Sequence, residues 1–216
     1  MAADPKADAS DLAEVILKDQ AMAMKVLRIA NSAQYALCPQ RVTTISRAVV
    51  LLGFESVRAI ALGLGAYNLL STLERGGKVH ERFWRESIAN AVACQGLAEL
   101  VGLRVPEEAF VAGLLHDVGK LILAAHDPEA SQRIHGQGAE GPALLAAETR
   151  AFGVNHAEVA GELARRWELP PVLQGALASH HRHYAVMPEP GPECMAFLVG
   201  VAKTLTAPLW CDGVNT

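Results

Sequence analysis

The sequence has few aromatic residues and no excess of charge of one sign. Aromatic residues make up 5% of the 216 residues, and 19 Lys and Arg are set against 23 Asp and Glu, for a net charge of −4. A chain without a basic excess or a basic block has little with which to hold a phosphate backbone. We therefore expect no direct binding to nucleic acid.

Cysteines are also few. The four of them, Cys38, Cys94, Cys194 and Cys211, lie far apart and form no C-x-x-C pair. This spacing excludes a zinc finger, a thioredoxin-type motif and a disulfide scaffold. Cys94 lies in an apolar run and is expected to be a small buried side chain.

Long hydrophobic runs are missing as well. Ala59–Leu70 is among the most apolar stretches, but it is too short for a membrane span and Gly63, Gly65 and Asn68 interrupt it. The N-terminus shows no charged-then-apolar leader. We expect a soluble, cytoplasmic protein with no membrane partner.

What the sequence does have is helical periodicity and ample apolar material for a core, with 51% hydrophobic residues. In residues 45–52 apolar side chains recur at i, i+3, i+4 and i+7, with Thr44 before them and Gly53 after them. No segment alternates long enough to predict a strand. The fold class is therefore predicted to be all-α, with on the order of ten helices.

Proline and capping patterns predict where several helices start, and glycine and proline predict a loop. The stretch His135–Pro142, with three glycines, is predicted to be that loop. Helices are predicted to begin near Pro106, Asn155 (with Glu158), Pro170–Pro171 and Pro192.

The chain is predicted to form two helical lobes of one continuous domain. The first lobe covers residues 1–73, and the polar, glycine-containing patch Glu74–Lys78 is predicted to connect it to the second, residues 79–212. The N-terminal lobe is expected to pack on the second.

The most specific segment is AGLLHDVGKLIL, Ala112–Leu123. An adjacent His116–Asp117 pair in apolar surroundings needs compensation, because a buried carboxylate is costly without a partner. A divalent metal bound by both side chains is one compensation. Alternatively, Asp117 caps the next helix. Gly119 is expected to let the chain turn, and Lys120 to present its ammonium to a phosphate or to Asp117.

Two further histidine groups are metal-ligand candidates: His156 at a helix start, and His180–His181 at a helix end. Adjacent helical residues point about 100° apart, so the pair is not expected to share one metal easily. A histidine near a helix C-terminus is also favoured by the helix dipole without any metal. The remaining histidines, His80, His126, His135 and His183, are predicted to be solvated.

Three blocks of this sequence resemble the HDOD domain, a divergent relative of the HD and HD-GYP metal-dependent phosphohydrolases of bacterial signalling. They are Asp19–Tyr35 with Ile45–Gly63, Phe83–Leu100 with Glu107–Leu123, and Asn155–Leu173 with Ser179–His181. The resemblance implies an N-terminal helical lobe on an HD-like helical core. It also implies that His116, Asp117, His156, His180 and His181 match metal ligands of the catalytic relatives.

Two positions depart from the catalytic pattern. The relatives carry a metal-binding histidine where this sequence has Glu86, and a final aspartate where it has Lys203. An ammonium in place of a carboxylate removes a ligand and repels a dication. Lys203 is therefore predicted to replace the metal by pairing with Asp117, while Glu86 remains a candidate oxygen ligand.

The resemblance and its departures predict a non-catalytic signalling or regulatory module that binds other signalling proteins or an unidentified small ligand. The alternative is a metal-dependent phosphohydrolase acting on a nucleotide or cyclic dinucleotide. It would use Fe, Mn, Ni or Zn in a rearranged site, with Asp117 and Lys120 as candidate catalytic residues. We also expect the chain to be a piece of a longer signalling protein.

Overall fold

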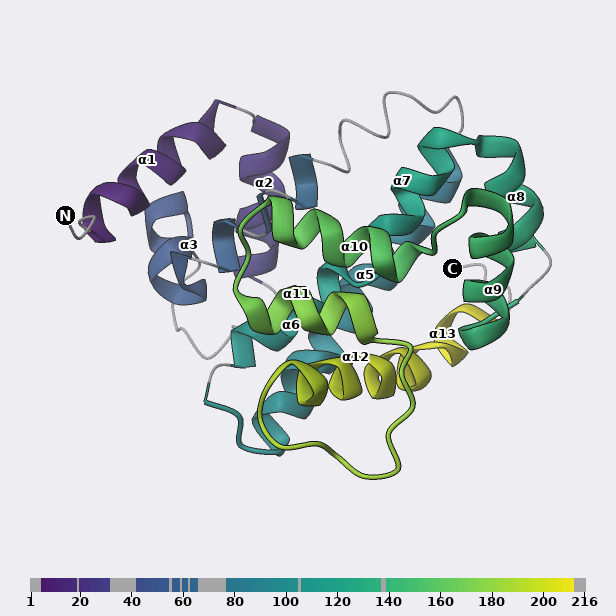
Figure 1. Cartoon of the computed structure of the whole chain (residues 1–216). Coiled ribbons are helices and arrows are strands. Elements are labelled where there is room, and N and C mark those ends of the chain that lie inside the picture. The colour runs from purple at the N-terminus through teal and green to yellow at the C-terminus, as the bar shows by residue number, and fades with distance from the viewer. Residues whose placement is uncertain are drawn as a thin grey trace. The chain divides into compact units, whose positions relative to one another are not determined.

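The computed structural model describes residues 5–18, 20–31, 42–54, 56–58, 60–61, 63–65, 77–104, 106–136 and 139–211. These residues contain helices and no strand, which confirms the predicted all-α class (Figure 1). The chain divides into two compact units, Met1–Ala66 and Tyr67–Thr216, here called unit 1 and unit 2. The predicted lobe boundary at residue 73 lies outside the described residues.

Unit 1 contains helices α1 (Pro5–Leu17), α2 (Gln20–Ala30) and α3 (Ile45–Leu52), and each of these contacts the other two. The ends of α3 are those that the sequence predicts. Thr44 accepts a hydrogen bond from the Arg47 backbone N–H (3.3 Å), and Gly53 ends the helix at φ 83°. The core of the unit is apolar and includes Ile16, Val26, Ile29, Val49, Leu52, Val57, Ile60 and Leu64.

Replacing Leu52 by alanine is expected to lower the free energy of unfolding by about 2–5 kcal/mol, because its side chain is 2% exposed in this core. Urea denaturation measures the change. Val50→Ala is the matched control, since Val50 lies on the same helix and is 86% exposed. Equal effects of the two variants would contradict the core assignment.

Unit 2 begins with helix α5 (Gly77–Leu100), which packs on α6 (Pro106–Leu115) and α12 (Pro192–Thr206). The predicted connector ended at Lys78, but Gly77 and Lys78 already belong to α5. Helices α10 (His156–Arg166) and α11 (Pro171–Ser179) lie above α12 in Figure 1, each in contact with the next. The short α13 (Pro208–Cys211) follows.

Helices α7 (Val118–His126), α8 (Pro128–Gly136) and α9 (Gly141–Phe152) complete unit 2. The predicted loop at residues 135–142 is wrong at both ends, because α8 continues through Gly136 and α9 starts at Gly141. Glycine is tolerated in the end turns of a helix, so the glycines alone predicted a loop that is too long. The predicted starts of α6, α10, α11 and α12 are confirmed.

One described segment, Pro106–His126, is long and apolar enough to cross a membrane by length and composition. It is 72% buried within the protein, and the turn at His116–Asp117 divides it into α6 and α7. It therefore has the character of a core element of a globular unit. Cys94, which faces this region from α5, is fully buried as expected.

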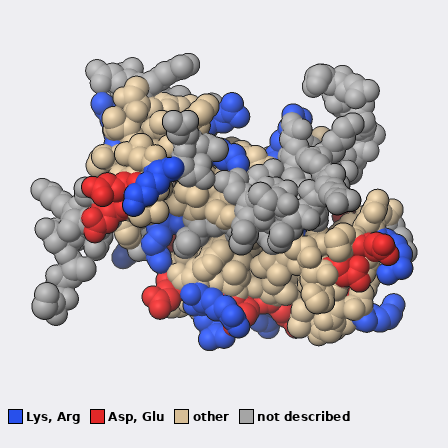
Figure 2. Space-filling model, turned by 90° about the horizontal axis from the view of Figure 1, so that it is seen from above, with Lys and Arg blue, Asp and Glu red and all other residues tan. Residues whose placement is uncertain are grey.

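On the face shown in Figure 2, Lys and Arg side chains are interspersed with Asp and Glu over the described surface. Among the described residues of α10, Glu162 forms ion pairs with both Arg165 and Arg166. Mixed charge of this kind does not make the basic stripe that a nucleic-acid backbone requires. That no nucleic acid binds stays a prediction.

Candidate functional site

Asp117 lies at the centre of the candidate site, in the turn between α6 and α7. It occupies the N-cap position of α7, as the capping alternative expected, but its side chain makes no capping hydrogen bond. The carboxylate points instead into a cluster of basic side chains. The exposed fraction of Asp117 is 7% and that of His116 is 3%, so both groups have left bulk water.

Two ammonium groups neutralise this carboxylate. Lys120 Nζ lies 2.6 Å from Asp117 Oδ2, and Lys203 Nζ lies 3.0 Å from Oδ2 and 3.1 Å from Oδ1. Lys120 comes from the first turn of α7 and Lys203 from the last turn of α12, 86 residues away. Both oxygens of the carboxylate thus accept charge-assisted hydrogen bonds.

The pKa values of the three groups follow from this arrangement. Burial on its own would raise the pKa of Asp117, but the ammonium groups of Lys120 and Lys203 hold it well below its usual range. Burial opposes the charge of Lys120, yet the Asp117 carboxylate raises the Lys120 pKa. Burial lowers the pKa of Lys203, an effect that Asp117 opposes and Lys120 reinforces.

Three imidazoles surround the same carboxylate with one nitrogen each. The Nε2 atoms of His116, His156 and His180 lie 3.2, 3.2 and 3.5 Å from an Asp117 oxygen. His180 begins the turn after α11, and His156 is the first residue of α10. Burial lowers the pKa of His116, and burial lowers the pKa of His180 to about 3. The imidazoles of His116 and His180 are therefore neutral at neutral pH.

The other ring nitrogen fixes the tautomer of His116 and of His180. Nδ1 of His116 lies 2.8 Å from the Gly113 carbonyl oxygen, and Nδ1 of His180 lies 2.9 Å from that of Leu177. A carbonyl oxygen only accepts, so Nδ1 carries the proton in both rings; for His116 this contact is shorter than the 3.2 Å from Nδ1 to the Asn90 amide nitrogen. Each Nε2 is left as a lone pair facing Asp117, and among the described residues His180 Nε2 is a buried atom without a hydrogen-bond partner.

His156 is held in the same way by a carboxylate. Its Nδ1 lies 2.6 Å from Glu148 Oε2 and its Nε2 lies 2.9 Å from His181 Nε2. Because Nδ1 donates to Glu148, Nε2 accepts the hydrogen bond from His181. Burial, reinforced by the adjacent His180, lowers the pKa of His181 to about 2.

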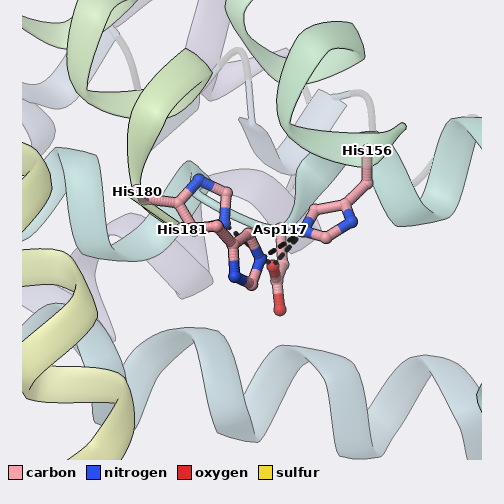
Figure 3. Close-up of side chains that lie close together, drawn as sticks. All are labelled: Asp117, His156, His180 and His181. Atoms are coloured by element: carbon pink, nitrogen blue, oxygen red, sulfur yellow. Dashed lines mark hydrogen bonds and ion pairs between the residues drawn. The ribbon is translucent and has the colours of Figure 1, made fainter. Parts of the chain in front are cut away.

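The side chains of His180 and His181 converge on the same site, which corrects the expectation that they point apart. Helix α11 ends at Ser179, so the 100° rule for helical neighbours does not apply to them. Their ring centroids are 4.3 Å apart. One ligand atom each from Asp117, His156, His180 and His181 lies within 4.8 Å of the others, and Figure 3 shows these side chains converging.

The close packing of α7 on α10 depends on Gly119. A Cβ at this position would overlap the carbonyl oxygen of His156. Gly119 lies within α7 and does not turn the chain, contrary to the expectation. Its role is to let the helix that follows Asp117 approach the backbone of His156.

A cavity of about 1110 Å³ opens over the site, and its lining includes Lys120, Lys203 and His181. Glu86 of α5 also lines this cavity but is not a member of the four-residue ligand group. His126 and His183 are exposed, as predicted, whereas His80 has no described side chain.

His135 is wrongly predicted to be solvated. Its side chain is 30% exposed, lines the cavity and lies 3.7 Å from Glu148. Glu148 itself, fully buried in α9, had no role in the sequence analysis. Its contact with His156 spans eight residues and two helices, and no local pattern marks it.

The donor set fits a divalent transition metal. Three imidazoles with Nδ1 committed to an acceptor, beside a carboxylate, are typical ligands of Fe, Mn, Ni or Zn. The buried lone pair of His180 Nε2 is the observation that favours such a ligand. The ammonium groups of Lys120 and Lys203 compete for the same carboxylate oxygens.

A family model described as the HDOD domain matches residues 1–183 of the chain. A curated protein of Treponema pallidum (strain Nichols), named "Uncharacterized protein", is 27% identical over 182 residues. The match covers 82% of this chain and 34% of that protein. The chain thus spans about a third of the length of this relative.

Solved structures from three bacteria are similar. An HDOD domain protein with unknown function from Geobacter sulfurreducens has a TM-score of 0.68 at 29% identity, covering 94% of this chain and 67% of its own. A Shewanella amazonensis SB2B protein named "Putative phosphohydrolase" has a TM-score of 0.64 at 27% identity. The match covers 95% of this chain and 76% of that protein's chain. The MmoQ response regulator of Methylococcus capsulatus str. Bath has a TM-score of 0.56 at 30% identity. The match covers 96% of this chain and 81% of that protein's chain.

Proposed function

The chain belongs to the HDOD domain family, and on that premise we propose that it acts as a non-catalytic signalling module. The observation that carries the proposal is the double neutralisation of Asp117 by Lys120 and Lys203. A carboxylate that already accepts hydrogen bonds from two ammonium groups has no uncompensated charge to offer a dication.

The charges of the buried cluster support this proposal. Asp117 and Glu148 supply two negative charges and Lys120 and Lys203 supply two positive charges, so these four charges sum to zero. A dication added to them would leave a net charge of two in a partly desolvated site. At about 4 Å and an effective dielectric near 20, each unit charge pair interacts by about 4 kcal/mol. Metal binding therefore requires a lysine to withdraw.

The module is proposed to work through binding. The 1110 Å³ cavity is of a size that suits a small ligand, and its wall combines Phe83, Tyr184 and Phe197 with the polar groups of the site. The likeness to a response regulator supports other signalling proteins as partners. We propose a cytoplasmic module that receives or transmits a signal in this way.

The second candidate is the metal-dependent phosphohydrolase, and the imidazole geometry favours it. His116, Asp117, His156, His180 and His181 would hold the metal, which would polarise a phosphate and lower the pKa of a bound water. Lys120 would then hold a phosphate oxygen. Glu86, which lines the cavity from α5, would be a further oxygen ligand of the metal. The likeness to the Shewanella protein supports this candidate.

Metal content and turnover decide between the two candidates. The protein is purified without oxygen, its metals are quantified by mass spectrometry, and cyclic dinucleotides and nucleotides are offered with Mn²⁺ or Fe²⁺. We expect much less than one metal per chain and no turnover above that of an Asp117→Ala control. One tightly bound metal per chain with turnover would establish the phosphohydrolase.

A further inference from the structure

Glu148 is a fully buried carboxylate that lies behind His156, on the side away from Asp117. Its Oε2 accepts hydrogen bonds from the His156 backbone N–H (2.9 Å) and from Nδ1 (2.6 Å). A buried carboxylate is costly unless such donors compensate it. Burial would raise the pKa of Glu148, but the bonds from His156 hold it below the usual range.

This contact determines which nitrogen His156 offers to the site. With the proton on Nδ1 committed to Glu148, Nε2 is the nitrogen that faces the site, 2.9 Å from His181 Nε2 and 3.2 Å from Asp117 Oδ1. His116 and His180 reach the same state with backbone carbonyls. For His156 the acceptor is a side chain from another helix, Glu148 of α9. Asn155 and Glu158, which are nearer in the sequence, already accept backbone N–H groups in the capping box of α10.

The second oxygen of Glu148 faces the cavity wall. Glu148 Oε1 and His135 Nε2 are both buried atoms without a hydrogen-bond partner among the described residues, and they lie 3.7 Å apart. His135 belongs to α8 and lines the cavity. Glu148 therefore lies between a ring that faces Asp117 and a ring that lines the cavity.

We propose that Glu148 is the positioning residue of this site: its Oε2 fixes the tautomer and orientation of His156. The inference rests on the proposed function for the location of the site. It adds Glu148 of α9 to the residues that determine how the site is arranged. Nothing in it requires that a metal be bound.

The first test is the tautomer of His156 in the unaltered protein, read from long-range ¹H–¹⁵N spectra and assigned with a His156→Asn variant. We expect the proton on Nδ1, with a resonance shifted far downfield by the charged acceptor. Glu148→Gln should move this resonance upfield. Glu129→Gln, which changes an exposed acid in the first turn of α8 outside the cavity lining, should leave it in place. A proton on Nε2 in the unaltered protein would overturn the proposal even if Glu148→Gln does not fold.

The second test uses Co²⁺ as a probe in a Lys203→Asp background, where the family's carboxylate is restored. Adding Glu148→Gln should weaken Co²⁺ binding about 10–100-fold, the usual effect of removing a carboxylate behind a ligating histidine. Glu129→Gln should not change it. Unchanged affinity in the Glu148→Gln variant would overturn the positioning role. If Lys203→Asp binds no Co²⁺ at all, the charge argument of the proposed function fails, and the tautomer spectra still decide the role of Glu148.

Discussion

In metal-free buffer, Lys203→Asp should melt well below the wild type, and Mn²⁺ or Fe²⁺ should restore most of the loss. The substitution changes the buried cluster from two positive and two negative charges to one positive and three negative. Leaving a buried charge without its partner costs about 3–5 kcal/mol. For a chain of this size that corresponds to a shift of about 6–20 °C in Tm.

The rescue by metal follows from the same count of charges. A dication next to Asp117 and Asp at position 203 makes the altered cluster neutral again, with neutral imidazoles to complete the ligand set. Lys203→Ala, which only removes a cation, should lose less, because Lys120 still neutralises Asp117 at 2.6 Å. It should also gain less from the metal than Lys203→Asp does.

Thermal melts with and without metal and chelator make the measurement. Leu205→Asp is the matched control, since it adds a negative charge to an exposed position of α12 outside the cavity lining. Its Tm should be close to that of the wild type and should not change when the metal is added. A wild type that Mn²⁺ stabilises and a chelator weakens would contradict the replacement of the metal by Lys203.

The all-α class and most helix starts could be predicted because their signals are local. The capping box of α10 is an example: Asn155 accepts from two backbone N–H groups, and Glu158 accepts from the Asn155 N–H. Each of these bonds joins residues no more than three apart. The signals of Thr44 and Gly53 at the ends of α3 are local as well, because their bonds join residues three and four apart.

The geometry of the site could be predicted only in part. The resemblance named the residues around Asp117, but treating His180–His181 as helical placed the two rings apart, because nothing local marks the end of α11 at Ser179. Glu148 and His135 were missed for a related reason. Their contacts join α8, α9 and α10, and side chains that meet across helices leave no periodic signal in the sequence.

Acid should destabilise the protein steeply, starting near pH 6.5. His180 and His181 have pKa values of about 3 and about 2 in the folded state, chiefly because of burial, against about 6.5 when unfolded. Between these values the unfolded chain binds more protons than the folded one, so the free energy of unfolding falls as the pH falls. The slope is about 1.4 kcal/mol per pH unit for each histidine, or about 2 kcal/mol each between pH 6.5 and pH 5.

Urea denaturation at pH 7, 6 and 5 measures this slope, and two asparagine variants identify its source. His180→Asn removes one of the groups that resists protonation, so its stability should fall less between pH 7 and pH 5, by about 2 kcal/mol. His183→Asn is the control, because His183 is exposed and should leave the slope unchanged. Below pH 4 the lowered pKa values of Asp117 and Glu148 add to the loss, since their charged forms are the ones that the cluster stabilises. A free energy of unfolding that stays level from pH 7 to pH 5, or a His180→Asn slope equal to that of the wild type, would show that the imidazoles around Asp117 are not held neutral.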